Sequence, residues 1–347
     1  MLDFWRLPAF RVCLATLMAS AALLLPLLVR TPIEIRGLDK LMPLQVVVMF
    51  VAIALVSSAL VHRYRHDPKG PARLIVGVAS RAFDFMTANL YLMLFTGAAV
   101  PLCFMAFSVP FPMQDSAFAR LDSALGFDWQ YWLGQTNSHP ALGKILIWSY
   151  ESFVPQMFAI TALFSMTGRT RELWDFMVLV TLTCLAAIIV SAIVPAIGPY
   201  GYYNPDPYSF AALDQMLPGV GRFHLANVTA VHSGQLPVLD VMGNHGLVTF
   251  PSYHAVLAFA LAYVVRCDKW LFVPSLVLNG LMLVSTVPVG GHYLVDLFGG
   301  LAIFLATVAL LDWVNGRASL WSMLRCRMQQ APVNFGLARP SLPDPQA

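Results

Sequence analysis

The sequence predicts an all-α protein, a polytopic bundle of about eight transmembrane helices. Of its 347 residues, 58% are hydrophobic and only 11% are charged, whereas a soluble domain carries about 25% charged residues. The mean hydropathy is +0.69, and the apolar residues gather in runs close to the roughly 20 that one membrane crossing needs. The net charge of +3 is too small to indicate a nucleic-acid partner, and we expect none.

Eight apolar runs divide the chain in order. The first is expected to be a retained helix, because its apolar core is long for a signal peptide and Arg30-Thr31-Pro32 is a poor cleavage site. We expect two N-terminal helices and a basic loop in residues 1–82, a catalytic membrane domain in residues 83–313, and a polar, disordered cytoplasmic tail in residues 314–347. The predicted spans are residues 12–29, 43–61, 86–108, 141–165, 173–194, 249–265, 270–287 and 292–313.

Basic loops indicate the orientation, because cytoplasmic loops carry an excess of lysine and arginine. The strongest basic segment covers residues 62–69, and the loops at 168–171 and 266–269 are also basic. With eight spans these loops all fall on the side of both termini, so we expect that side to be cytoplasmic. The long segment 195–248 then lies outside, where it is expected to cap a head-group pocket. The compact loops favour the inner (plasma) membrane of a bacterium, with the active site facing the periplasm.

A short helix that lies in the membrane interface is predicted after the third span. Its apolar face contains Phe118, Leu121 and Leu125, while Asp115 and Asp122 lie mostly on other faces. Several aromatic residues follow it, as is typical of interfacial anchors.

The first of two polar clusters stands at the start of the sixth span. Pro251 suits the first turn of a helix, because its missing N–H is not needed there. Ser252 and His254 are then expected in that turn, beside free backbone N–H groups and the positive end of the helix dipole. This arrangement predicts an anion site.

The second polar cluster opens the last span. His292 and Asp296 are four residues apart, so both lie on one helical face. A carboxylate there accepts the imidazole N–H, fixes the tautomer and stabilises the charge that forms. The preceding Gly290 and Gly291 are expected to leave room for a phosphate. The topology brings both clusters to the non-cytoplasmic face.

Metal binding is the weaker interpretation of these side chains. Two histidines and one aspartate can hold a metal, but the carboxylate four residues after His292 is better explained as its orienting partner. The five cysteines are scattered and form no CxxC pair. We expect no metal, no other cofactor and no disulfide framework.

Both clusters resemble signature motifs of the type 2 phosphatidic acid phosphatase superfamily. Pro251-Ser252-x-His254 is similar to the second motif, and Ser285-x6-His292-x3-Asp296 to the third. The segment 286–300 resembles the branch that contains fungal inositol phosphorylceramide synthase. The likeness extends over about residues 115–313 and implies a six-helix catalytic core, with the first two spans as additions.

The resemblance implies a role for each catalytic candidate. His292 would be the nucleophile that attacks phosphorus and forms a phosphohistidine, and Asp296 would orient it. His254 would protonate the leaving alkoxide and then activate the acceptor. Ser252 would bind a phosphate oxygen. The candidate substrate-binding residues are Ser252, Tyr253, Gly291 and Arg222.

The chain departs from the family pattern at three cationic positions. The first motif is a Lys, six residues, then Arg-Pro, but here Ser191 and Gly198-Pro199 stand at the matching places. Thr286 replaces the arginine that usually follows the serine of the third motif. Phosphoryl transfer needs positive charge near the phosphate oxygens. Arg222, in the outer segment, is the best remaining side chain.

The predicted function is that of a membrane phosphatase or phosphotransferase acting on a phospholipid, sphingolipid or polyprenyl phosphate, with an alcohol as the possible acceptor. The alternatives are a lipid transporter or flippase, a catalytically degenerate relative, and a purely structural membrane protein. Glu151, deep in the fourth span, is compatible with transport or substrate contact. The sequence does not indicate an oligomeric state.

Overall fold

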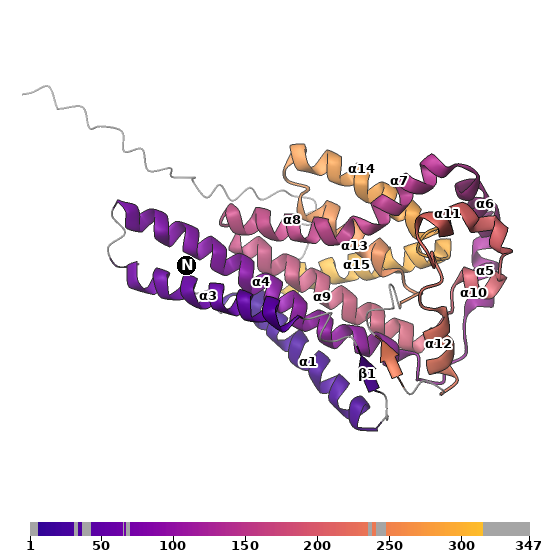
Figure 1. Ribbon diagram of the computed structural model, residues 1–347, viewed down its shortest axis with the longest axis horizontal. Coiled ribbons are helices and arrows are strands. Elements are labelled where there is room, and N and C mark those ends of the chain that lie inside the picture. The colour runs from indigo at the N-terminus through magenta and orange to yellow at the C-terminus, as the bar shows by residue number, and fades with distance from the viewer. Residues whose placement is uncertain are drawn as a thin grey trace, which may run out of the picture.

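The chain folds into a polytopic bundle of helices, as predicted (Figure 1). The computed structural model describes residues 6–30, 34–36, 43–64, 66, 70–234, 238–240 and 248–314. The predicted disordered tail lies outside the described residues. The longer helices are α1 (Pro8–Arg30), α3 (Leu44–Tyr64), α4 (Pro71–Ala106), α7 (Pro140–Glu151), α8 (Phe153–Met166), α9 (Thr170–Ile193), α13 (Tyr253–Val264), α14 (Lys269–Thr286) and α15 (Leu294–Val314).

Six of the described helices are long and apolar enough to cross a membrane, so the chain is an integral membrane protein. They are α1, α3, α4, α9, α14 and α15. The two remaining predicted spans coincide with shorter apolar helices, α8 and α13.

Helix α9 is the central helix of the bundle. Residues Phe176 to Thr181 are all buried, so this helix is covered on every side. It packs against α1, α4, α13 and α15. Because α13 and α15 both pack against α9, their starts lie close together.

Two predicted boundaries differ in the structure. Helix α4 begins at Pro71, so the expected division between residues 82 and 83 falls inside a helix. The fourth predicted span is broken at Ser152 into α7 and α8. Pro155 has no N–H for the carbonyl of Glu151, which accounts for the break. Glu151 itself is exposed on the surface of the chain.

Short helices gather at one end of the bundle, opposite the end where α3 finishes and α4 begins (Figure 1). There, strand β1 (Glu34–Arg36) pairs in parallel with β2 (Val238–Asp240), so the connection after α1 meets the outer segment. The short helices are α5 (Asp115–Ala124), α6 (Trp129–Ser138), α10 (Pro199–Tyr203), the 3-10 helix η2 (Pro207–Phe210), α11 (Ala211–Met216) and α12 (Leu225–His232).

Helix α5 divides its predicted apolar face between the protein interior and the surface. Its buried residues include Asp115, Phe118 and Asp122, whereas Leu121 and Leu125 are 49% and 59% exposed. The two acids point inward because they accept backbone hydrogen bonds from other segments, described below. The exposed apolar residues Leu121 and Leu125 can therefore face a membrane.

Candidate active site

The starts of α13 and α15 lie together at the end of the bundle that carries the short helices. The N–H of Ser252 donates to the carbonyl of Asp296 at 3.1 Å. Close packing supports this contact, because a side chain at Gly300 would meet the Ser252 carbonyl at 2.7 Å. The two polar clusters are thus joined through their backbones.

Ser252 is the N-cap of α13 and does not lie in its first turn. Its Oγ accepts the N–H of Ala255 at 3.3 Å, and the residue is fully buried. Pro251 therefore stands one residue before the cap, which corrects its expected place in the helix. Because Ala255 is capped, Tyr253 and His254 supply the two first-turn N–H groups for which α13 offers no acceptor.

His254 lies in the first turn of α13, against the break between α7 and α8. Its ring stacks on Tyr150, with centroids 4.0 Å apart, and meets the edge of Phe153 at 5.0 Å. Within the described residues its Nε2 atom is buried and has no hydrogen-bond partner. A buried polar atom of this kind is costly unless something else fills the position, such as a substrate or water.

The ring of His292 is held by a backbone acceptor. Its Nδ1 lies 2.8 Å from the carbonyl oxygen of Thr249 and 3.2 Å from Oδ2 of Asp296. A carbonyl only accepts, so Nδ1 carries the proton and Nε2 carries the lone pair. His292 precedes the last span, and burial lowers its pKa to about 4, so the ring is neutral near pH 7.

Asp296 is fully buried in the first turn of α15. Its Oδ2 also accepts the N–H of Tyr293 at 2.9 Å. Its Oδ1 is buried without a partner among the described residues. The structure thus brings His292 into contact with Asp296, and the start of α13, which carries His254, into contact with the start of α15.

Two aspartates of α5 position the start of α15. Asp122 accepts the N–H groups of Leu294 and Val295 at 2.8 Å and 3.0 Å. Asp115 accepts the hydroxyl of Tyr293 at 3.0 Å. Asp115 also accepts the N–H groups of Ile197 and Gly198, at 3.0 Å and 2.8 Å. Sequence reasoning missed both roles. Their seven-residue spacing was the available signal, since it places both acids on one helical face.

The glycines near His292 make room for the chain itself. Gly291 has φ +68°, and a side chain there would meet the carbonyl of Gly221 at 2.7 Å and Tyr200 at 3.0 Å. A side chain at Gly290 would meet Tyr150 at 2.9 Å. The packing of the chain itself therefore requires both glycines, and their role in leaving room for a phosphate stays a prediction.

Tyr253 and Arg222 both make contacts within the protein. The hydroxyl of Tyr253 donates to the carbonyl of Val180 on α9 at 2.9 Å. Arg222 pairs with Asp214 at 2.6 Å and lies over the ring of Phe210 at 4.5 Å. Their role in phosphate binding stays a prediction.

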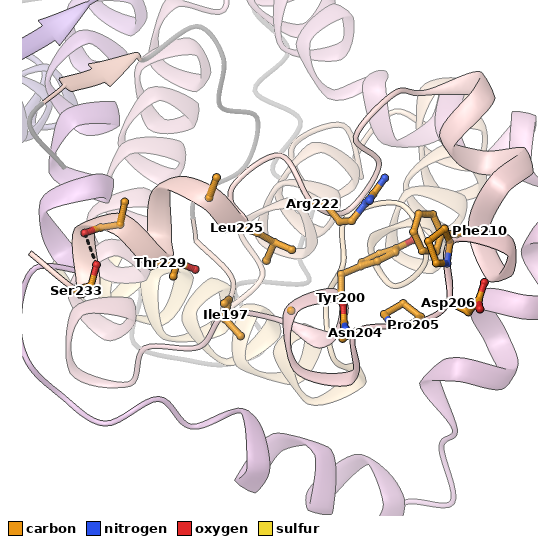
Figure 2. A pocket seen from close by; sticks show the side chains of 14 residues that line it. Ile197, Tyr200, Asn204, Pro205, Asp206, Phe210, Arg222, Leu225, Thr229 and Ser233 are labelled. Carbon is orange, nitrogen blue, oxygen red and sulfur yellow. Dashed lines mark hydrogen bonds between the residues drawn. The ribbon is translucent and has the colours of Figure 1, made fainter. Parts of the chain in front are cut away.

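Arg222 lines a cavity of about 930 Å³ in the outer segment. Figure 2 shows Arg222, Tyr200 and Phe210 gathered at one end, with Thr229 and Ser233 toward the other. The described residues 195–234 thus form a folded segment with its own cavity. Tyr200 connects the cavity wall to the site, because its ring also packs against Gly291.

His224 is a buried histidine of the outer segment that sequence reasoning left without a role. Its Nε2 lies 3.0 Å from the carbonyl oxygen of Ile197, and the residue is 4% exposed. Burial lowers its pKa to about 4, and the electrostatic effect of His292 acts in the same direction. The only signal in the sequence was its position in a segment rich in glycine and tyrosine.

The described residues contain no group of three or more histidine, cysteine, aspartate or glutamate side chains arranged to hold a metal ion.

Comparison with known proteins finds one family. A family model described as the PAP2 superfamily matches residues 116–310, which is more than half of the chain and includes both polar clusters. No curated protein and no solved structure matches the chain.

Proposed function

This chain belongs to the PAP2 superfamily, whose members have a lipid phosphatase-type function, and we propose that it cleaves the phosphate ester of a membrane lipid through a phosphohistidine at His292. One observation carries the proposal. The 2.8 Å hydrogen bond from His292 Nδ1 to the Thr249 carbonyl leaves the lone pair on Nε2, where a nucleophile needs it.

In the first half-reaction, Nε2 of His292 attacks phosphorus. The P–N bond forms as the P–O bond to the lipid alkoxide breaks on the opposite side. His254, in its protonated form, gives its proton to the leaving alkoxide. Asp296 stabilises the positive charge that develops on the ring of His292.

In the second half-reaction, neutral His254 takes a proton from water or an alcohol. The oxygen of that acceptor attacks phosphorus, and the P–N bond breaks to restore neutral His292. Water gives free phosphate or a phosphomonoester, whereas an alcohol gives a new phosphate ester. Hydrolysis and transfer therefore differ only in the acceptor.

The phosphate is bound mainly by the backbone in this proposal. The first-turn N–H groups of Tyr253 and His254 lie at the positive end of α13 and donate to phosphate oxygens. Ser252 acts by capping this turn, and Gly291 acts by permitting the tight turn that carries His292. In this proposal Ser252 and Gly291 therefore affect substrate binding indirectly, by shaping the backbone around the phosphate.

Arg222 and the 930 Å³ cavity supply a place for a head group or an alcohol acceptor. The cavity adjoins the site through Tyr200 and carries one arginine and one aspartate, Asp206, among aromatic, amide and hydroxyl groups. Such a lining suits a polar head group. This supports an inositolphosphotransferase-like activity on a phospholipid, sphingolipid or polyprenyl phosphate.

The orientation is part of the proposal. We place both termini in the cytoplasm of a bacterium and the site at the periplasmic face. Supporting this, the β1–β2 pair joins the connection after α1 to the outer segment, two parts that the eight-span count places on the same side. In a cysteine-free background, Ser233→Cys should react with an impermeant maleimide in intact cells, whereas Thr167→Cys should not. If Thr167→Cys reacted and Ser233→Cys did not, the site would face the cytoplasm instead, and the proposed orientation would be wrong.

A lipid panel assayed on the detergent-purified protein tests the activity. The assay contains EDTA and is run with and without inositol or glycerol. We expect release of phosphate or exchange of the head group, abolished in His292→Ala and retained in His232→Ala. Turnover that persists in His292→Ala would exclude this mechanism. A transporter would show no turnover in any format.

A further inference from the structure

A third histidine lies beside the catalytic pair. His224 comes from the outer segment, far in sequence from both polar clusters, yet it is buried within electrostatic range of His292. We propose that His224 binds the phosphate group of the substrate and supplies part of the charge that phosphoryl transfer needs. This inference rests on the proposed function.

The first step is the position of the ring. A side chain at Gly198 would meet His224 Nε2 at 3.7 Å, Thr249 Cγ2 at 3.1 Å and the carbonyl oxygen of Gly291 at 2.9 Å. Thr249 accepts the hydrogen bond of His292, and Gly291 directly precedes it. His224 therefore borders the same small region as the backbone that holds the nucleophile.

The second step is the comparison with the other basic side chains of the described segment 195–234, which are Arg222 and His232. Arg222 is paired with Asp214 at 2.6 Å and lines the outer cavity. His232 Nδ1 lies 3.3 Å from the carbonyl oxygen of Phe107, on α4's C-terminal side. Of the three, His224 is the one whose ring borders the backbone of Thr249 and Gly291, which holds His292.

The third step is the proton. In the neutral ring Nε2–H donates to the Ile197 carbonyl, so Nδ1 carries a lone pair. A phosphate monoanion brings its own proton and can donate it to Nδ1. If the proton moves to the ring, an imidazolium then faces a phosphate dianion, and the total number of protons is unchanged. Such a charge-assisted hydrogen bond is stronger than a neutral one.

The surroundings of His224 allow both the neutral and the protonated form of its ring. Burial and the nearby His292 favour the neutral ring and lower its pKa to about 4. The Ile197 carbonyl and Asp115 favour the protonated ring. A phosphate that binds here adds negative charge near the ring, so it favours the protonated form, as Asp115 does.

Two replacements separate phosphate binding from a structural role. His224→Gln keeps an N–H donor for the Ile197 carbonyl but cannot take up a proton. His224→Lys keeps a cation but loses the planar ring. The matched control is His232→Gln, a histidine of the same segment that also meets a backbone carbonyl.

The experiment measures binding of inorganic phosphate to the detergent-purified protein by titration calorimetry, with thermal unfolding of each variant. We expect His224→Gln to weaken phosphate binding by about 10-fold or more, the loss of one charge-assisted hydrogen bond, with an unchanged Tm. His224→Lys should recover much of the affinity, and His232→Gln should bind like the wild type.

Wild-type affinity in His224→Gln would overturn the inference. Equal weakening in both His224 variants, with a lowered Tm, would show that the ring only holds the segment in place and would also overturn it. Absence of phosphate binding in the wild type would do the same. Phosphate binding that depends on His224, in a protein that turns over no lipid, would support this site and refute the proposed function.

Discussion

The Nδ1 atom of His292 lies 2.8 Å from the carbonyl oxygen of Thr249, closer than its 3.2 Å distance to Asp296 Oδ2. A backbone group therefore fixes the tautomer of the ring, and the carboxylate is left chiefly to stabilise charge. In a triad that relies on its carboxylate for both tasks, loss of the acid lowers kcat by about 10,000-fold. Here the two tasks are divided between Thr249 and Asp296.

Asp296→Asn should lower kcat by about 100-fold, at the low end of what one preorganised electrostatic group contributes. The amide oxygen can still accept the N–H of Tyr293, and Thr249 still holds the ring, so the fold and the tautomer should survive. Steady-state kinetics and thermal unfolding measure both effects. Asp128→Asn is the control, because asparagine caps α6 as well as aspartate does. Wild-type kcat in Asp296→Asn would contradict this division of roles.

Asp122→Ala should destabilise the protein by about 1–2 kcal/mol, the usual effect of losing a helix cap. It removes the acceptor of two N–H groups, those of Leu294 and Val295, at a 1% exposed position. Activity should fall as well, because the same turn positions Asp296. Asp122→Asn should show a smaller loss, since one oxygen can still accept. Thermal unfolding in detergent gives the comparison, and an unchanged Tm in Asp122→Ala would mean that α15 starts without this cap.

Gly291→Ala should abolish activity and lower the Tm. The added Cβ would lie 2.7 Å from the Gly221 carbonyl at a φ of +68°, so the turn before His292 must shift. Gly134→Ala is the matched control, because no atom lies within 4 Å of a side chain at that position of α6. Equal activity of the two variants would show that the turn tolerates the displacement.

The stability of the fold should depend on pH through His224. Burial lowers its pKa to about 4 in the folded chain, while an unfolded histidine has a pKa of about 6.5. As the pH falls through this window the unfolded chain binds the proton first, so the free energy of unfolding decreases. The Tm should therefore fall between about pH 6.5 and about pH 4, and less in His224→Gln than in the wild type or in His232→Gln. Equal pH dependence in all three proteins would exclude His224 as the source.

Much of the architecture could be predicted because hydrophobic runs of membrane length are visible in the sequence itself. The helical bundle was confirmed, and all eight predicted spans correspond to apolar helices, although two of these are short. The break at Ser152 was not predicted, even though Pro155 was the visible cause. In the structure this break lets Tyr150 and Phe153 both pack against His254.

Less of the candidate site could be predicted, because its remaining parts depend on contacts between distant segments. Spacing alone placed His292 and Asp296 on one face. It could not show that Asp122 lies against the start of α15, more than 170 residues away in sequence. The burial of Asp115 and Asp122 on α5 was not predicted for the same reason, since their hydrogen-bond partners lie elsewhere in the chain. His224 and Gly221 were likewise undetectable until the outer segment was seen folded against Gly198 and Gly291.

The most direct test is to identify the phosphorylated atom during turnover. The detergent-purified protein is incubated with a lipid substrate labelled with ³²P and quenched in alkali, and the modified peptide is mapped by mass spectrometry. The account predicts an alkali-stable, acid-labile phosphohistidine at Nε2 of His292, absent in His292→Ala and present in His232→Ala. Phosphate on Nδ1, on another residue, or retained in His292→Ala would contradict it.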